Sequence, residues 1–254
     1  MALQGRHALV TGGGRGIGRA IAAALAGAGC SVTVTVTGRN ETSLREAVAA
    51  GDAAGFVIAD VTDAQAVAKS IETAVAARGS IDILVNNAGT AVGSPFVKAK
   101  PALFQDMWNM HVMGAVYASQ AVLPGMIARG FGRIVNIAST ASLRGYVNFT
   151  AYCAAKHAVL GLTRALAVET AKTGVTVNAV CPGYTDTDLV RGGIAQAAAR
   201  SGRPSEDVLA EFASVAPIGR LIRPQEVAAA ALYLCSPDAA AVTGTALTIA
   251  GGEM

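Results

Sequence analysis

Tyr152 and Lys156 stand four residues apart in the run Tyr152-Cys-Ala-Ala-Lys156. On a helix this spacing places the phenol and the ammonium on one face, within reach of each other. The pKa of a tyrosine is ordinarily about 10, and a fixed cation beside the phenolate lowers it. With Ser139 one short strand and loop upstream, the pair is a candidate acid–base catalyst. The competing interpretation is a solvated pair, because this spacing arises by chance in many helices.

A glycine-rich loop, Thr11-Gly-Gly-Gly-Arg-Gly-Ile-Gly18, precedes this group in the chain. Gly12, Gly16 and Gly18 carry no side chain, so the backbone can turn tightly and approach a pyrophosphate at a helix N-terminus. Arg15 and Ile17 lie between these glycines. The loop therefore predicts a dinucleotide site, and the competing interpretation is a simple turn leading into a helix.

The composition excludes several classes of protein. The chain has 254 residues, of which 52% are hydrophobic and 15% charged, and its mean hydropathy is +0.46. It is too apolar for disorder. Residues 20–38 are uncharged, but their glycines and alternating Val-Thr pattern indicate a helix, a turn and a strand instead of a membrane span. Without a secretory leader, the chain is expected to be soluble and cytoplasmic.

Nucleic acids and metals are not expected as partners either. The formal charge is +3 and no dense basic run is present, which gives no case for nucleic-acid binding. The four cysteines are scattered without a C-x-x-C pair, and no metal ligand set is visible.

Strand-like runs alternate with alanine-rich helical runs along the chain. Strands are expected at 7–11, 32–37, 55–59, 81–85, 133–138, 175–181 and 246–249. Helices are expected at 16–28, 41–50, from an Asp63 N-cap to 78, from Pro101 to a break near 124–125, at 151–170 and at 224–234, with a less patterned segment before 217. This order predicts an α/β fold, a single-domain doubly wound parallel sheet (Rossmann-like) over residues 1–254, with about seven strands and helices on both faces.

The candidate motifs share one location in this scheme. The loop 11–18, Arg39, Asp60, Asn87, Ser139 and Pro182-Gly183 each follow a predicted strand directly. In open parallel sheets, ligands bind beyond the carboxyl ends of the strands, where the strand order reverses. We therefore expect these residues to gather around one ligand.

Taken together and in this order, the motifs resemble those of the short-chain dehydrogenase/reductase family, and the chain is similar to 3-oxoacyl-carrier-protein reductases and related ketoreductases. The resemblance runs nearly end to end. It implies that Ser139 hydrogen-bonds the substrate oxygen and that Tyr152 exchanges the proton. Lys156 would lower the pKa of the tyrosine and hold the nicotinamide ribose. His111 stands where many members have an asparagine that completes a water relay, so it either holds that water or is a core histidine.

The resemblance also implies the cofactor contacts. Beyond the glycine loop these are Asp60 and Val61 at the adenine, Asn87 lining the cleft, and Pro182, Gly183, Thr185 and Thr187 at the nicotinamide. Arg15 and Arg39 stand where family members that use NADP carry arginines, and no acid ends the second strand. NADP is expected, with NAD as the alternative, because this strand is about two residues longer than usual and Arg39 could shift by roughly 6–7 Å.

The expected reaction is hydride transfer between NADP(H) and a ketone or a 3-oxoacyl thioester. The segment 187–217 corresponds to the family's substrate loop, and its arginines could steer an anionic carrier: Arg191, Arg200, Arg203 and, just beyond, Arg220. Arg144 would meet an acidic substrate or pair on the surface. The alternatives are an NAD-linked 3-hydroxyacyl or hydroxyacid dehydrogenase, and a dinucleotide-binding sensor without catalysis. Family likeness implies a homotetramer.

Overall fold

The computed structural model describes residues 3–36 and 41–253, and its framework is one seven-stranded sheet. The strands are β1 (His7–Thr11), β2 (Ser31–Val36), β3 (Gly55–Ile58), β4 (Ile83–Asn86), β5 (Gly132–Ile137), β6 (Val175–Pro182) and β7 (Ala246–Ile249). Their order in the sheet is β3-β2-β1-β4-β5-β6-β7, and every pairing is parallel.

Helices connect these strands. They are α1 (Gly16–Gly27), α2 (Thr42–Ala49), α3 (Ala64–Arg78), α4 (Pro101–Trp108), α5 (Gly114–Ala128), α6 (Thr150–Thr170), α7 (Asp188–Ser201), α8 (Ser205–Ser214) and α9 (Pro224–Cys235). Shorter turns are η1 (Phe96–Lys98), the π-helical η2 (Asn109–Met113), η3 (Thr140–Ser142) and η4 (Pro237–Ala239).

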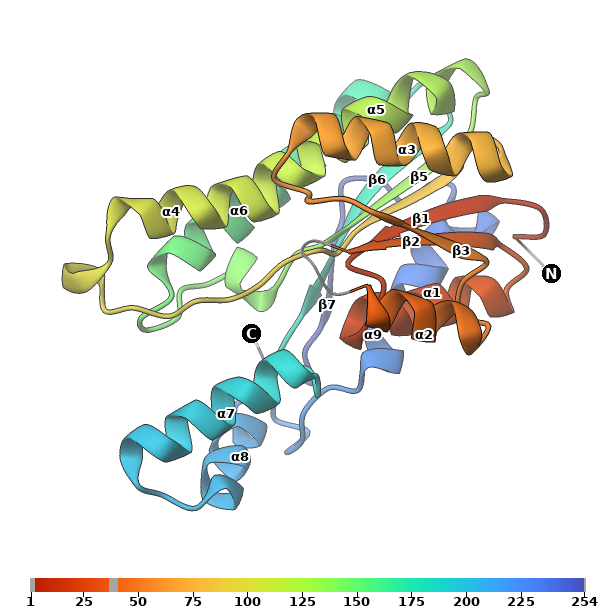
Figure 1. Cartoon of the computed structure of the whole chain (residues 1–254). Helices are drawn as coiled ribbons and strands as arrows, with labels where there is room; N and C mark the ends of the chain where they lie inside the picture. The colour runs from red at the N-terminus through yellow and green to blue at the C-terminus, as the bar shows by residue number, and fades with distance from the viewer. Residues whose placement is uncertain (1–2, 37–40, 254) are drawn as a thin grey trace.

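Helices cover both faces of the sheet (Figure 1). α1, α2 and α9 lie on one side, and α3, α5, α4 and α6 lie on the other. The central strands explain this arrangement, since every residue of β1, β5 and β6 is buried. Strands that are apolar on both faces need a layer of helices on each face. The predicted doubly wound parallel sheet is confirmed.

The strand order reverses beside β1, which pairs with β2 on one side and with β4 on the other. Chain connections therefore leave the carboxyl ends of β1 and β4 in opposite directions, and a crevice opens between them. The glycine loop follows β1 and Asn87 follows β4. The fold thus brings two predicted cofactor segments to one point.

Local signals set several helix ends as expected. The Asp63 carboxylate accepts hydrogen bonds from the backbone N–H groups of Gln65 (2.8 Å) and Ala66 (3.1 Å), which caps α3. Pro101 begins α4, where a missing N–H costs nothing. Both predicted helix starts are confirmed.

The predicted helix break at Pro124-Gly125 is wrong. α5 runs through Pro124 to Ala128, because Val122 and Met126 on either side of the proline are buried in the core. This packing outweighs the hydrogen bond that a proline removes. The long helical region is interrupted earlier, where η2 inserts a π-helical turn that contains His111.

The segment before residue 217 is also more regular than expected, since it contains α7 and α8. These helices extend away from the sheet as a hairpin (Figure 1). A small apolar cluster holds them together, and its buried members are Ile194, Ala198, Val208 and Leu221. The predicted substrate segment, named the lid below, is therefore a helical hairpin with its own core. No helix in residues 3–36 and 41–253 is long and apolar enough to cross a membrane.

Leu234→Ala tests the α9 face of the core. Leu234 is completely buried in the cluster that also contains Leu25 of α1. Removing its side chain leaves a cavity, so we expect the free energy of unfolding in guanidinium chloride to fall by about 2–5 kcal/mol. The matched control is Tyr233→Ala, an exposed neighbour that should change it by less than about 0.5 kcal/mol. Equal losses would contradict this assignment of the core.

Candidate active site

A cavity of about 380 Å³ opens at the carboxyl ends of the strands. It is lined by residues from the glycine loop, the end of β4, the end of β5, α6 and the segment after β6. The predicted site residues in its wall are Gly12, Arg15, Gly16, Ile17, Gly18, Asn87, His111, Ser139, Tyr152, Lys156, Pro182, Gly183, Thr185 and Thr187. Segments far apart in the sequence thus meet around one space.

The glycine loop forms a cradle that no side chain could occupy. A Cβ on Gly18 would lie 2.3 Å from the Gly12 carbonyl oxygen, and one on Gly12 would lie 2.9 Å from the Asn87 side-chain amide. Gly16 has a φ of +53°, which favours glycine. The N-cap residue Arg15 makes no side-chain cap hydrogen bond within the described residues, and the first turn of α1 lines the cavity. This cradle fits the pyrophosphate of a dinucleotide.

Asn87 holds the cradle in place. Its side-chain Nδ2 donates to the carbonyl oxygens of Thr11 (2.9 Å) and Gly12 (3.1 Å). The Thr11 hydroxyl in turn accepts from the backbone N–H of Asn87 (2.9 Å) and of Ala88 (3.0 Å). Asn87 therefore has a bracing role in addition to lining the cavity.

Two other predicted cofactor residues lie outside the cavity wall. Asp60 is exposed after β3, and its carboxylate accepts from the backbone N–H and the hydroxyl of Thr62. Val61 is buried and packs against Gly114. Arg39 lies outside the described residues, whereas Arg15 is exposed at the mouth of the glycine loop.

Ser139 and Tyr152 form the polar centre of the cavity. Ser139 caps η3 by accepting a 3.1 Å hydrogen bond from the backbone N–H of Ala141. Its hydroxyl also hydrogen-bonds the Tyr152 phenol, which lowers the pKa of the tyrosine. Burial acts in the opposite direction with greater effect and raises the pKa of Tyr152 to about 12. The phenol is therefore protonated at neutral pH and can donate a proton.

Lys156 leaves the pKa of Tyr152 above its ordinary value, whereas the spacing predicted a lowered one. Its ammonium donates a 2.7 Å hydrogen bond to the Ile137 carbonyl oxygen and lies 5.7 Å from the centre of the Tyr152 ring. Burial lowers the pKa of Lys156 to about 8, since a low-dielectric site disfavours any charged form. The same desolvation acts on both groups and outweighs their attraction.

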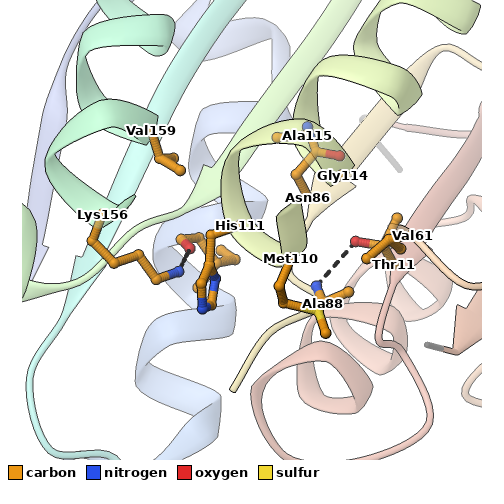
Figure 2. A pocket seen from close by; sticks show the side chains of 11 residues that line it. Thr11, Val61, Asn86, Ala88, Met110, His111, Gly114, Ala115, Lys156 and Val159 are labelled. Atoms are coloured by element: carbon orange, nitrogen blue, oxygen red, sulfur yellow. Dashed lines mark hydrogen bonds between the residues drawn. The ribbon is translucent and has the colours of Figure 1, made fainter. Parts of the chain in front are cut away.

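His111 lies directly beside this pair. Its ring packs edge-on against Tyr152 with centroids 5.4 Å apart, and its Nε2 lies 2.8 Å from the Thr90 carbonyl oxygen. Figure 2 shows the His111 ring next to the end of the Lys156 side chain. Burial and the Lys156 charge lower the pKa of His111 to about 3. The imidazole is therefore neutral at neutral pH, and no inflexion of its own is expected there.

The Nδ1 atom of His111 is buried and has no hydrogen-bond partner within the described chain. Lys156 and His111 both line a separate cavity with about 10 Å³ of room, seen in Figure 2. That space suits one water molecule. A water in this space could donate a hydrogen bond to His111 Nδ1 and bridge it to Lys156.

Sequence reasoning missed several residues of the cavity wall: Gly14, Ser43, Thr90, Asp188 and Leu189. Ser43 could have been found from its place shortly after the second strand, and its hydroxyl would lie 2.6 Å from a Cβ on Gly14. Leu189 is half exposed on α7. Within the described chain, no group of three His, Cys, Asp or Glu side chains could hold a metal ion.

The arginines of the lid are mostly paired. Arg191 forms two hydrogen bonds with Asp186 (2.6 and 2.7 Å), Arg203 pairs with Glu211 (2.6 Å) and Arg220 pairs with Glu226 (2.7 Å). Neutralised charges steer an anion weakly. The lid therefore gives little support to the expected attraction of an anionic carrier.

His111→Asn tests the neutral buried imidazole. The pKa of His111 is about 3 in the folded protein, and its ordinary value is 6.5. As the pH falls below 6.5, the unfolded chain takes up a proton that the folded protein does not. The contribution of neutral His111 to stability is therefore complete above pH 6.5 and is lost as the pH falls towards 3. Between pH 7.5 and 5 the wild-type free energy of unfolding should fall by about 2 kcal/mol more than that of His111→Asn. The exposed His157 supplies the control, His157→Asn, which should follow the wild type. Identical pH dependence in all three proteins would contradict this burial effect.

Comparisons with known proteins agree with this geometry. A family model described as enoyl-(acyl carrier protein) reductase matches residues 12–253. The chain is 37% identical over 252 residues to 3-oxoacyl-acyl-carrier-protein reductase FabG of Vibrio harveyi, covering 99% of this chain and 98% of that one. It is 40% identical over 250 residues to acetoacetyl-CoA reductase of Rhizobium meliloti, covering 98% of both.

A solved structure of an actinorhodin polyketide ketoreductase variant with NADPH superimposes with a TM-score of 0.93 at 37% identity, covering 98% of this chain and 97% of that one. Levodione reductase superimposes with a TM-score of 0.93 at 33% identity, covering 99% and 98%. The predicted family, fold and oxidoreductase class are confirmed. On its sequence, its sheet order and the geometry of its cavity, this chain belongs to the short-chain dehydrogenase/reductase family, whose members are NAD(P)-dependent oxidoreductases.

Proposed function

We propose that this protein is an NADPH-dependent ketoreductase that reduces a ketone or a 3-oxoacyl thioester to a secondary alcohol. The observation that carries the proposal is the convergence of Ser139, Tyr152 and Lys156 on the cavity that also holds the glycine cradle. The named relatives that reduce 3-oxoacyl and acetoacetyl thioesters support the substrate class. The protein acts as a single domain over residues 1–254, with residues 187–217 closing over the substrate.

The cofactor is NADP rather than NAD. The ketoreductase structure with NADPH supports this choice, as does Arg15 at the mouth of the cradle, with Arg39 as its predicted companion. The glycine loop and Asn87 would hold the pyrophosphate, while Pro182, Gly183, Thr185 and Thr187 would contact the nicotinamide and Lys156 its ribose. Asp60 and Val61 remain predicted adenine contacts. NADPH, when bound, supplies the hydride.

The chain's own residues handle the proton. As the carbonyl carbon gains a hydride, negative charge develops on its oxygen. The Ser139 and Tyr152 hydroxyls stabilise that charge, and the Tyr152 O–H bond breaks as its proton moves to the oxygen. The product is a secondary alcohol and the tyrosine is left as phenolate. Because burial keeps Tyr152 protonated, its proton is available for the reduction.

His111 completes the return of the proton. Its neutral ring can bind a water in the small cavity that it shares with Lys156, so that Nδ1 and the ammonium have a common partner. After Lys156 has reprotonated Tyr152, such a water would pass a proton from the solvent to Lys156 and so restore its ammonium form. His111 thereby takes the place of the asparagine that many relatives use.

Assembly and location follow from likeness alone. We propose a cytoplasmic homotetramer formed through the long helices and the carboxyl-terminal strand. Trp108 at the end of α4 is 44% exposed and supplies an apolar contact for such an interface.

Tyr152→Phe tests the proposed chemistry. The substitution keeps the ring and removes the proton, so turnover of NADPH with a 3-oxoacyl thioester should fall at least about 100-fold. NADPH consumption at 340 nm measures this. Tyr233→Phe, an exposed tyrosine outside the cavity, should retain wild-type turnover. Full activity in Tyr152→Phe would sink the proposal.

Arg15→Ala tests the choice of cofactor and the alternative of an NAD-linked dehydrogenase. Loss of a charge-assisted contact to the 2′-phosphate should weaken NADPH binding at least about tenfold and leave NADH binding unchanged. Fluorescence titration with both cofactors gives the two affinities. Arg19→Ala is the control, since Arg19 lies in the first turns of α1, just after Arg15, but pairs with Asp52. A wild-type preference for NADH would favour the NAD-linked alternative.

A further inference from the structure

A buried carboxylate from the chain's tail lies behind the active site. Glu253, the second-last residue, is only 3% exposed. Its Oε1 accepts a 2.5 Å hydrogen bond from Arg144 Nη2 and a second, short one from the Tyr146 hydroxyl. A buried carboxylate is costly unless it is paired in this way. Arg144 therefore pairs with the tail instead of meeting a substrate.

Through Tyr146 this carboxylate reaches the loop that carries Ser139. The Tyr146 hydroxyl lies 2.6 Å from that of Thr140, the residue directly after Ser139. Burial and the bond to Glu253 raise the pKa of Tyr146 to about 12. The phenol O–H thus donates a hydrogen bond to the Glu253 carboxylate, and the phenol oxygen accepts one from the Thr140 hydroxyl. Glu253, Tyr146 and Thr140 form a continuous chain to the catalytic loop.

The same carboxylate touches the opposite wall of the cavity. A Cβ on Gly183 would lie 2.6 Å from Glu253 Oε2, and Gly183 lines the cofactor cavity. The next residue, Tyr184, packs edge-on against Tyr146 with ring centroids 6.3 Å apart and against Phe212 of α8 at 4.8 Å. Aromatic contacts therefore continue the chain to the base of the lid.

The turn before Glu253 is held by the end of the lid segment. The backbone N–H of Ile218 donates a 3.1 Å hydrogen bond to the Gly251 carbonyl oxygen. A Cβ on Gly251 would lie 2.4 Å from the Ile218 side chain, and its φ is +60°. The tail is therefore fixed in one conformation between the Ser139 loop, the segment after β6 and the lid.

We propose that Glu253 is a positioning residue that ties the Ser139 loop to the Gly183–Tyr184 segment and so sets the width of the active site between them. This inference rests on the proposed function only for the catalytic role of Ser139 and the cofactor contact of Gly183; the contacts of Glu253 are independent of it. Glu253 itself touches no reacting atom. Glu253 thus supports the active-site wall from behind, through residues that contact those lining the cavity.

The first test compares Glu253→Gln, Tyr146→Phe and the double variant in turnover of NADPH with a 3-oxoacyl thioester. Each single variant should lower kcat about tenfold, because a small displacement of catalytic groups is costly. The KM for NADPH should change less, by about threefold at most, since the glycine cradle is untouched and only the nicotinamide end of the cofactor site moves. The double variant should be no worse than the poorer single one, as expected for two residues in one chain of contacts. Multiplicative losses, or an unchanged kcat, would overturn the proposal.

The second test follows hydrogen–deuterium exchange and needs no substrate. In Glu253→Gln the amides of residues 140–146 and 183–187 should exchange faster together, while those of α1 keep the wild-type rate. Asp238→Asn, an exposed carboxylate also near the carboxyl end, is the matched control and should change neither segment. Faster exchange throughout the protein would indicate a general loss of stability and refute a positioning role. If the wild type reduces no ketone, the proposed function fails while this measurement still decides whether Glu253 links the two segments.

Discussion

The hydrogen bonds between the ends of β1 and β4 are the constraint on which the site depends. The Thr11 hydroxyl accepts two backbone N–H groups from the β4 end, and the Asn87 side chain returns two hydrogen bonds to the β1 end. These four hydrogen bonds hold the glycine loop against the end of β4, at the point where the strand order reverses. Glycines are required there because the chains approach too closely for a Cβ. The shape of the glycine cradle therefore follows from the hydrogen bonds that hold the ends of β1 and β4 together.

Burial decides the charge states in the catalytic group. Tyr152, Lys156 and His111 share one desolvated region. Burial raises the pKa of the tyrosine and lowers the pKa values of the lysine and the histidine, so the neutral form of each group is favoured. A phenol that stays protonated is a proton donor for reduction, and an imidazole that stays neutral can both donate and accept. The simple picture of a cation acidifying its helical neighbour omits this desolvation. It also omits the Ile137 carbonyl, which receives the lysine's hydrogen bond.

The lid and the tail show how distant segments complete the wall. α7 and α8 have a small apolar core of their own, and Arg191 and Arg203 pair with nearby carboxylates. Glu253 connects this region to the Ser139 loop through Arg144 and Tyr146. Selectivity for a substrate is therefore better sought in the shape of the cavity and its Leu189 side than in long-range charge attraction.

The sequence by itself determined the parallel sheet and brought out the glycine loop and the proposed catalytic trio, because period-two and helical patterns, glycine spacing and an i,i+4 pair are local signals. His7–Thr11 and Ala246–Ile249 even have the predicted bounds. Only the tertiary structure decided the π-helical turn at His111, the continuation of α5 through Pro124 and the direction of the Tyr152 pKa shift. These depend on burial and on neighbours distant in the chain. The contact between Glu253 and Tyr146 spans 107 residues, and no local pattern records such a pairing.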